Sequence, residues 1–191
     1  YTPARFIDAG GTPLALRKPK RTIAGDVFAR LMRGNVIILA SVVVRRAALA
    51  RVGGFDASLP VLGCEDWDLW LRLARRQPVA VVDEELTLYR QHPANTPTPQ
   101  LLASGLAVID KLYADPAVER DASLSRAAAR ARLYWYTAGA AARDRRAAAL
   151  PLIAHALREF PATAVSRPAA AALAALVLPP VAARALARIR W

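Results

Sequence analysis

Three carboxylates at the start of one predicted helix are the residues of this chain best suited to chemistry. Glu65, Asp66 and Asp68 open an apolar segment. At about 3.6 residues per turn, Asp66 shares its helix face with the apolar residues three, four and seven positions later, namely Leu69, Trp70 and Leu73. Glu65 and Asp68 instead share the more polar side with Arg72 and Arg75. We therefore expect the side chain of Asp66 to point into a cleft.

A carboxylate in the first turn of a helix interacts favourably with the free N–H groups there, by roughly 0.3–1 kcal/mol, and this interaction favours its ionised form. An ionised carboxylate that faces a cleft is suited to act as a general base or to orient a hydroxyl group. The alternative is that Asp66 only caps the first turn of its helix, as many acidic residues at helix starts do.

The composition indicates a chain with a real core and an excess of positive charge. Its 191 residues suffice for one medium domain or a small domain with an appendage, and its net charge is +12. Cys64 is the only cysteine, which excludes an intrachain disulfide and favours a reducing, cytoplasmic compartment. No compact basic block, zinc pattern or RNA-recognition signature is present, so we do not expect a nucleic-acid partner.

One apolar run deserves comparison with a membrane-spanning helix. It extends from Pro168 to Ala183 and contains Pro179-Pro180. Because a spanning helix needs about 20 apolar residues, and because proline interrupts helices, we do not expect a transmembrane segment there.

The first half of the sequence predicts short strands that alternate with helices, which is typical of an α/β domain with a mixed, short-stranded sheet. The expected strands are 37–44, buried on both faces, 79–82 and 86–89. The expected helices are 26–32, 46–52, which ends at Gly53-Gly54, and the acidic helix from residue 65. The rest of the first 35 residues is expected to form loops and turns.

The proline-rich segment 93–99 predicts a linker, and almost only helix is expected after it. Helices are predicted at 101–113, 124–142, 146–160 and 162–178, followed by an arginine-rich segment that ends at Trp191. The second and third of these have a faint similarity to a tetratricopeptide repeat, but a single copy is more typical of an ordinary helical hairpin. We therefore divide the chain into an α/β part, 1–97, and a helical tail region, 98–191.

Four short motifs follow one another in the first half of the chain. They are Gly34-Asn35 with Ser41-Val42-Val43-Val44-Arg45-Arg46, then Val52-Gly53-Gly54-Phe55-Asp56, then Glu65-Asp66-Trp67-Asp68-Leu69-Trp70-Leu71-Arg72-Leu73, and finally Leu88-Tyr89-Arg90-Gln91-His92 with Asn95. In order and spacing these motifs resemble the second half of a family 2 glycosyltransferase. The resemblance covers roughly residues 1–97.

The resemblance implies a partial GT-A domain, the nucleotide-diphospho-sugar transferase fold, with its acceptor-binding half in residues 1–97 and an all-helical C-terminal region. In such enzymes the second acidic residue of the Glu-Asp pair is the base that deprotonates the acceptor hydroxyl, and here it is Asp66. The resemblance also places Glu65, Trp67, Gly54 and Phe55 at the acceptor site. From the residues alone, the glycines predict a tight turn, Phe55 a plug in the core, and Trp67 a ring on which a sugar can stack.

In the GT-A fold a histidine after the last sheet strand can complete a metal shell or contact the diphosphate, and His92 is the candidate here. Arg90 is a second candidate for contact with the diphosphate. The resemblance implies a divalent metal, Mg2+ or Mn2+, with His92 as its candidate ligand. The donor-side Asp-x-Asp motif of the family has no counterpart before Ile38. We therefore expect either a fragment without the donor-binding half or a degenerate relative, and the absence of a Gln-x-x-Arg-Trp motif favours transfer of single sugars.

The leading hypothesis is an inverting, hexosyltransferase-like enzyme that transfers one sugar from a nucleotide-diphospho-sugar donor to a glycan or lipid-linked acceptor, in cell-surface polysaccharide biosynthesis. The alternative is a non-catalytic helical interaction or membrane-surface module attached to a degenerate glycosyltransferase remnant. In the last segment apolar residues alternate with Arg184, Arg188 and Arg190, which suits peripheral contact with an anionic membrane, although a helix packed on its neighbours has the same pattern. The expected location is the cytoplasm, with peripheral contact at the inner face of the cell membrane.

Overall fold

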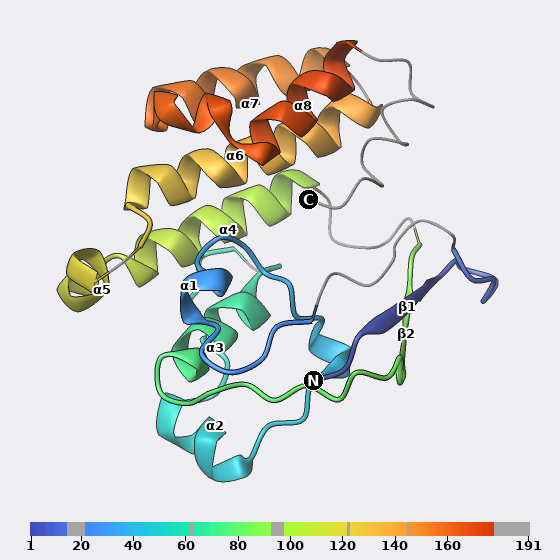
Figure 1. Ribbon diagram of the computed structural model, residues 1–191, viewed down its shortest axis with the longest axis vertical. Helices are drawn as coiled ribbons and strands as arrows, with labels where there is room; N and C mark the ends of the chain where they lie inside the picture. Colours follow the sequence, from blue (N-terminus) through green and yellow to red (C-terminus); the bar gives the residue numbers. More distant parts are fainter. Residues whose placement is uncertain (15–21, 62, 93–97, 122, 145, 178–191) are drawn as a thin grey trace. The chain divides into compact units, whose positions relative to one another are not determined.

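The computed structural model describes residues 1–14, 22–61, 63–92, 98–121, 123–144 and 146–177 (Figure 1). The chain forms two compact units, Tyr1–Pro97 and Thr98–Trp191, called the N-terminal and the C-terminal unit below. Most of the predicted linker and the arginine-rich last segment lie outside the described residues.

A two-stranded parallel sheet joins the beginning and the end of the N-terminal unit (Figure 1). Strand β1 (Ala4–Ile7) pairs with β2 (Thr87–Arg90). Isolated antiparallel bridges also join Ile7 to Pro13 and Gly25 to Val79. The strand predicted at 86–89 is therefore confirmed with a shift of one residue, whereas the strand predicted at 79–82 is reduced to the bridge at Val79.

The strand predicted at 37–44 is wrong. Leu39–Ser41 forms a short 3-10 helix, η1, and the side chain of Val43 is 95% exposed. Both the backbone N–H and the hydroxyl of Ser41 donate to the carbonyl oxygen of Ile38, at 2.9 and 2.7 Å. These local hydrogen bonds offer the backbone an alternative to strand pairing, which a run of β-branched residues does not reveal.

The described part of the N-terminal unit contains the α-helices α1 (Phe28–Leu31), α2 (Arg46–Val52) and α3 (Glu65–Ala74). Both α1 and α2 pack against α3. Helix α2 ends as predicted, because Gly53 adopts a positive φ of 83°, a conformation that only glycine reaches easily. Helix α3 carries buried residues on nearly all sides, namely Trp67, Asp68, Leu69, Trp70, Leu71, Leu73 and Ala74. It is therefore the central element of this unit.

The C-terminal unit consists of helices. They are α4 (Thr98–Leu112), α5 (Pro116–Asp121), α6 (Arg126–Asp144), α7 (Arg146–Glu159), the 3-10 helix η2 (Pro161–Val165) and α8 (Arg167–Val177). Helix α6 is central to this unit, since α4, α7 and α8 all pack against it (Figure 1). The four long helices confirm the predicted ones within a few residues, while α5 and η2 were not predicted.

The core of the C-terminal unit is built mainly from alanine around one large ring. Trp135 is 1% exposed, and its indole N–H donates to the hydroxyl of Thr163 at 3.0 Å. The buried alanines are Ala138, Ala142, Ala149, Ala156, Ala169, Ala172 and Ala175. A Cβ placed on Gly139 would lie 3.6 Å from the Cα of Ala172, so small residues let α6 and α8 approach closely.

The molecule is thus a mixed α/β chain, mostly helical, with a small parallel sheet, and the predicted fold class is confirmed. No helix within the described residues is both long and apolar enough to cross a lipid bilayer.

Candidate active site

The N-terminus of α3 presents Asp66 from the central element of the N-terminal unit. Asp66 is partly buried, while Trp67 directly after it is 3% exposed. The indole N–H of Trp67 donates to the carbonyl oxygen of Leu31 at 2.8 Å, which fixes the start of α3 against the end of α1. The position of Asp66 is therefore set by a well-packed helix.

Hydrogen bonds from two other residues hold the carboxylate of Asp66. Its Oδ1 accepts from the backbone N–H of Trp67 at 2.7 Å, and its Oδ2 accepts from the side-chain amide of Asn35 at 3.0 Å. The first contact is the capping role that the sequence left open as an alternative. The second comes from a residue 31 positions earlier in the chain. Since an ionised carboxylate offers about four lone-pair sites, both oxygens retain capacity to accept a further proton donor.

Burial raises the pKa of the Asp66 carboxyl above its ordinary value of 3.8. The negative charge of Glu65 acts in the same direction, whereas the hydrogen bonds from Trp67 and Asn35 lower the pKa. Loss of water around the charged form therefore outweighs the donors at the helix start. A carboxylate in this state accepts a proton more readily than one in water.

Asp68 is more deeply buried than Asp66, which corrects its predicted place on the polar side of the helix. Asp68 is 4% exposed, and its Oδ2 accepts from Nη2 and Nε of Arg72 at 2.7 and 2.9 Å. The same guanidinium donates to the carbonyl oxygens of Val52 and Gly54, at 2.5 and 2.7 Å. Arg72 thereby ties the glycine turn after α2 to the helix that carries Asp66, and Asp68 neutralises its charge.

Glu65 lies beside Asp66 and binds the loop that precedes the helix. Its Oε2 accepts from the backbone N–H of Gly63 at 2.6 Å. This contact orders the chain just before the first turn of α3. The acceptor-binding role that the resemblance gives Glu65 stays a prediction.

The glycine turn contains two predicted acceptor residues, Gly54 and Phe55, and only the burial of Phe55 differs from expectation. Gly54 has a φ of 71° and is held through its carbonyl oxygen by Arg72. Phe55 is 50% exposed, so the expectation that it plugs the core is wrong. Its ring is instead available at the surface, where an aromatic face can pack against a sugar.

Trp67 does not present a stacking surface. Its ring is 3% exposed, and its N–H is bonded to Leu31, so the structure gives it a packing role in place of the predicted contact with a sugar. Trp70, 5% exposed, is packed in the core as the sequence indicated.

Arg90 is the last residue of β2, and it contacts the loop that follows β1. Nη1 of Arg90 donates to the carbonyl oxygens of Asp8 and Ala9, at 3.2 and 2.9 Å. His92 is exposed, two residues after the strand ends. The roles of Arg90 and His92 in binding the diphosphate stay predictions.

A site for a divalent metal requires several oxygen or nitrogen ligands close together. Across the part of the chain that the structure describes, no group of three or more His, Cys, Asp and Glu side chains is placed to hold a metal ion. The described residues therefore do not by themselves assemble a site for the Mg2+ or Mn2+ that the resemblance implies, and His92 as a ligand stays a prediction.

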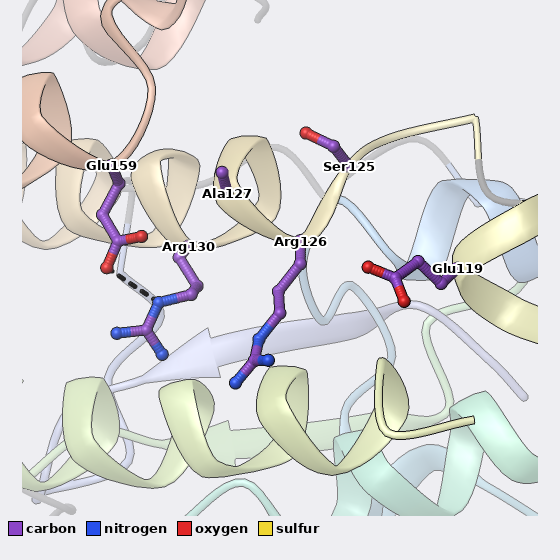
Figure 2. A pocket seen from close by; sticks show the side chains of 6 residues that line it. All are labelled: Glu119, Ser125, Arg126, Ala127, Arg130 and Glu159. Atoms are coloured by element: carbon purple, nitrogen blue, oxygen red, sulfur yellow. Dashed lines mark hydrogen bonds and ion pairs between the residues drawn. The ribbon is translucent and has the colours of Figure 1, made fainter. Parts of the chain in front are cut away.

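The C-terminal unit has a polar hollow of about 520 Å³ that the sequence did not indicate (Figure 2). It is lined by Glu119, Ser125, Arg126, Ala127, Arg130 and Glu159. Figure 2 shows Arg126 and Arg130 projecting from one side of α6, with Glu159 reaching Arg130 from the end of α7. Asp110 of α4 also pairs with both arginines, at 2.9 and 2.8 Å. Because these charges compensate one another, the cluster ties three helices together.

Asn35 is the site residue to which the sequence assigned no role. It belongs to the first of the four motifs, but its spacing from Asp66 gives no indication that the two side chains meet. The signal available in the sequence was its position directly after Gly34, in a turn that carries a polar side chain.

A family model matches part of the chain. Residues 24–98 match the family model described as glycosyltransferase like family 2, and this range contains Asn35, Arg72, Asp66 and the glycine turn. The resemblance stated from the four motifs is thereby confirmed, and the small sheet with its helices is consistent with part of a GT-A domain followed by a helical region. No curated protein and no solved structure matches the chain.

Proposed function

We propose that the protein transfers a single sugar from a nucleotide-diphospho-sugar to a hydroxyl group of a glycan or lipid-linked acceptor, with Asp66 as the base. The proposal starts from residues 24–98, which carry the sequence pattern of glycosyltransferase-like family 2. The observation that supports this proposal is the partly buried carboxylate of Asp66, which two hydrogen bonds hold at the start of the central helix and whose pKa is raised by burial.

In the proposed step, Asp66 accepts the proton of the acceptor hydroxyl while the oxygen of that hydroxyl attacks the anomeric carbon of the donor sugar. A new carbon–oxygen bond forms as the bond between the anomeric carbon and the diphosphate breaks. The nucleoside diphosphate leaves with the electron pair of that bond. Attack from the side opposite the leaving group inverts the configuration at the anomeric carbon. One base within hydrogen-bond reach of the attacking oxygen is sufficient for this reaction.

The diphosphate leaving group requires positive charge, for which the resemblance implies Mg2+ or Mn2+. The described residues of this chain do not assemble a site for such a metal, so no step of the proposal passes through one. Arg90 and His92, at the end of β2, are proposed as contacts for the diphosphate on the ground of the resemblance and of their exposure.

The test is sugar transfer by the natural full-length protein with Asp66→Asn. The substitution keeps the size of the side chain but removes its ability to take up a proton. Because general base catalysis contributes about 10²–10⁴-fold, we expect the transfer rate to fall by that factor. Glu84→Gln, which neutralises an exposed carboxylate elsewhere in the same unit, is the matched control and should retain the rate. Transfer by Asp66→Asn at the rate of the control would overturn the assignment of the base.

A further inference from the structure

The end of α1 and the segment that follows it, residues 31–35, are attached to the start of α3 at two points. The indole N–H of Trp67 donates to the carbonyl oxygen of Leu31, and the side-chain amide of Asn35 donates to Oδ2 of Asp66. Both bonds join the same short segment to adjacent residues of α3. This segment is therefore fixed against the carboxylate of Asp66.

The orientation of the Asn35 amide is itself determined by a second hydrogen bond. Its Oδ1 accepts from the backbone N–H of Ile37 at 3.0 Å, and Ile37 is 5% exposed. Because Oδ1 is engaged by this N–H, the NH2 group must face Asp66. A buried residue thus holds the amide in the orientation in which it donates to the carboxylate.

We propose that Asn35 is a positioning residue, which fixes the plane of the Asp66 carboxylate so that its remaining lone pairs face the acceptor hydroxyl. This inference rests on the proposed function, since it assumes that Asp66 is the base. Both oxygens of Asp66 accept a hydrogen bond from another residue, Oδ1 from Trp67 and Oδ2 from Asn35, so rotation of the carboxylate about its Cβ–Cγ bond breaks at least one of these bonds.

Asn35 also acts on the protonation of Asp66. Its hydrogen bond lowers the pKa of Asp66, against the effects of burial and of the neighbouring charge of Glu65. The amide therefore keeps the carboxylate ionised over a wider pH range than burial alone would allow. Positioning and control of protonation follow from the same contact.

The test uses Asn35→Asp and Asn35→Ala. Asn35→Asp keeps the acceptor for the N–H of Ile37 and replaces only the NH2 donor by a carboxylate oxygen, so the local turn is preserved. Asn35→Ala removes both contacts. Gln77→Ala, which removes a carboxamide that bonds Arg51, is the matched control.

The first measurement is the titration of the Asp66 carboxyl in this chain, followed by carbon NMR, which needs no activity. We expect the midpoint of this titration to rise in both Asn35 variants and to stay unchanged in Gln77→Ala. The rise should be larger in Asn35→Asp, because a like charge then faces Asp66. The second is steady-state transfer by the natural full-length protein. There kcat should fall by about 10²-fold in both Asn35 variants, with little change in the donor KM, because a small displacement of a catalytic group costs about that factor.

If the Asp66 midpoint and kcat are both unchanged in Asn35→Asp and Asn35→Ala, the role of Asn35 is overturned. The proposed function still stands in that case, provided that Asp66→Asn loses transfer. If Asp66→Asn itself transfers sugar at the normal rate, the proposed function fails, whatever the NMR midpoints are. The two failures are therefore distinguishable.

Discussion

At the level of single residues, burial and the helix N-terminus act on Asp66 in opposite directions. The sequence predicted a carboxylate that the first turn keeps ionised, and the N–H of Trp67 does bond it. Burial is nevertheless the larger effect and raises its pKa. Helical periodicity indicates which residues share a face, but it does not indicate how much water reaches each of them.

The raised pKa has a consequence for stability. Below the ordinary value of 3.8 the carboxyl is protonated in both the folded and the unfolded chain, so it contributes no pH dependence. Between 3.8 and the raised pKa the folded chain binds more protons than the unfolded chain. We therefore expect the free energy of unfolding of the wild type, relative to Asp66→Asn, to decrease as the pH rises through this window and then to level off.

Urea denaturation of the wild type and of Asp66→Asn at a series of pH values measures this difference. Glu84→Gln serves as the control for removal of an exposed carboxylate. A difference between wild type and Asp66→Asn that increases with pH would mean that Asp66 is stabilised as an anion, contrary to the role of burial described above.

At the level of elements, α3 depends on the ion pair and hydrogen bonds of Arg72. The guanidinium bonds the carbonyl oxygens of Val52 and Gly54 together with the buried Asp68. Arginine presents several N–H groups in a fixed plane, whereas lysine offers a single charged nitrogen. Arg72 uses its separate nitrogens to reach these acceptors, which one ammonium nitrogen cannot do from a single position.

Removal of this side chain should destabilise the N-terminal unit. Arg72→Ala removes the ion pair that Arg72 makes with the buried Asp68, and breaking such a pair costs about 3–5 kcal/mol. Arg72→Lys should lower the free energy of unfolding less, by roughly 1–3 kcal/mol, since it keeps the charge but loses hydrogen bonds to the turn. Denaturant unfolding followed by tryptophan fluorescence gives both values. Arg76→Ala, at an exposed position just after α3, is the control, and equal stability of Arg72→Ala and Arg76→Ala would refute the role of Arg72.

The elements differ in how far the sequence predicts them. The end of α2 was predictable because Gly53 supplies the positive φ that ends a helix locally. Strand β1 was not, since four residues form a strand only because β2, some 80 positions later, pairs with them, as in Arg5 with Leu88. The apolar run at 37–44 misled because Ser41 closes a local turn, which the run of β-branched residues does not reveal.

At the level of the whole molecule, the resemblance to family 2 glycosyltransferases was predictable from four ordered motifs, and residues 24–98 match the family model. The position of Asp66 at the start of the central helix followed from the third motif. Its contact with Asn35 did not, because it depends on how the turn after α1 folds back onto α3. The surface position of Phe55 was missed for a similar reason, as aromatic character alone does not determine burial.

The central claim is that Asp66 takes the proton from the acceptor hydroxyl. Its most direct test is the pH dependence of kcat/KM for sugar transfer by the natural full-length protein, compared with the NMR titration of Asp66 in the same protein. The account predicts that the rate rises with pH as the Asp66 carboxyl ionises, with one midpoint for both measurements and that midpoint above 3.8. A rate that does not change across the pH range in which Asp66 titrates would contradict the claim.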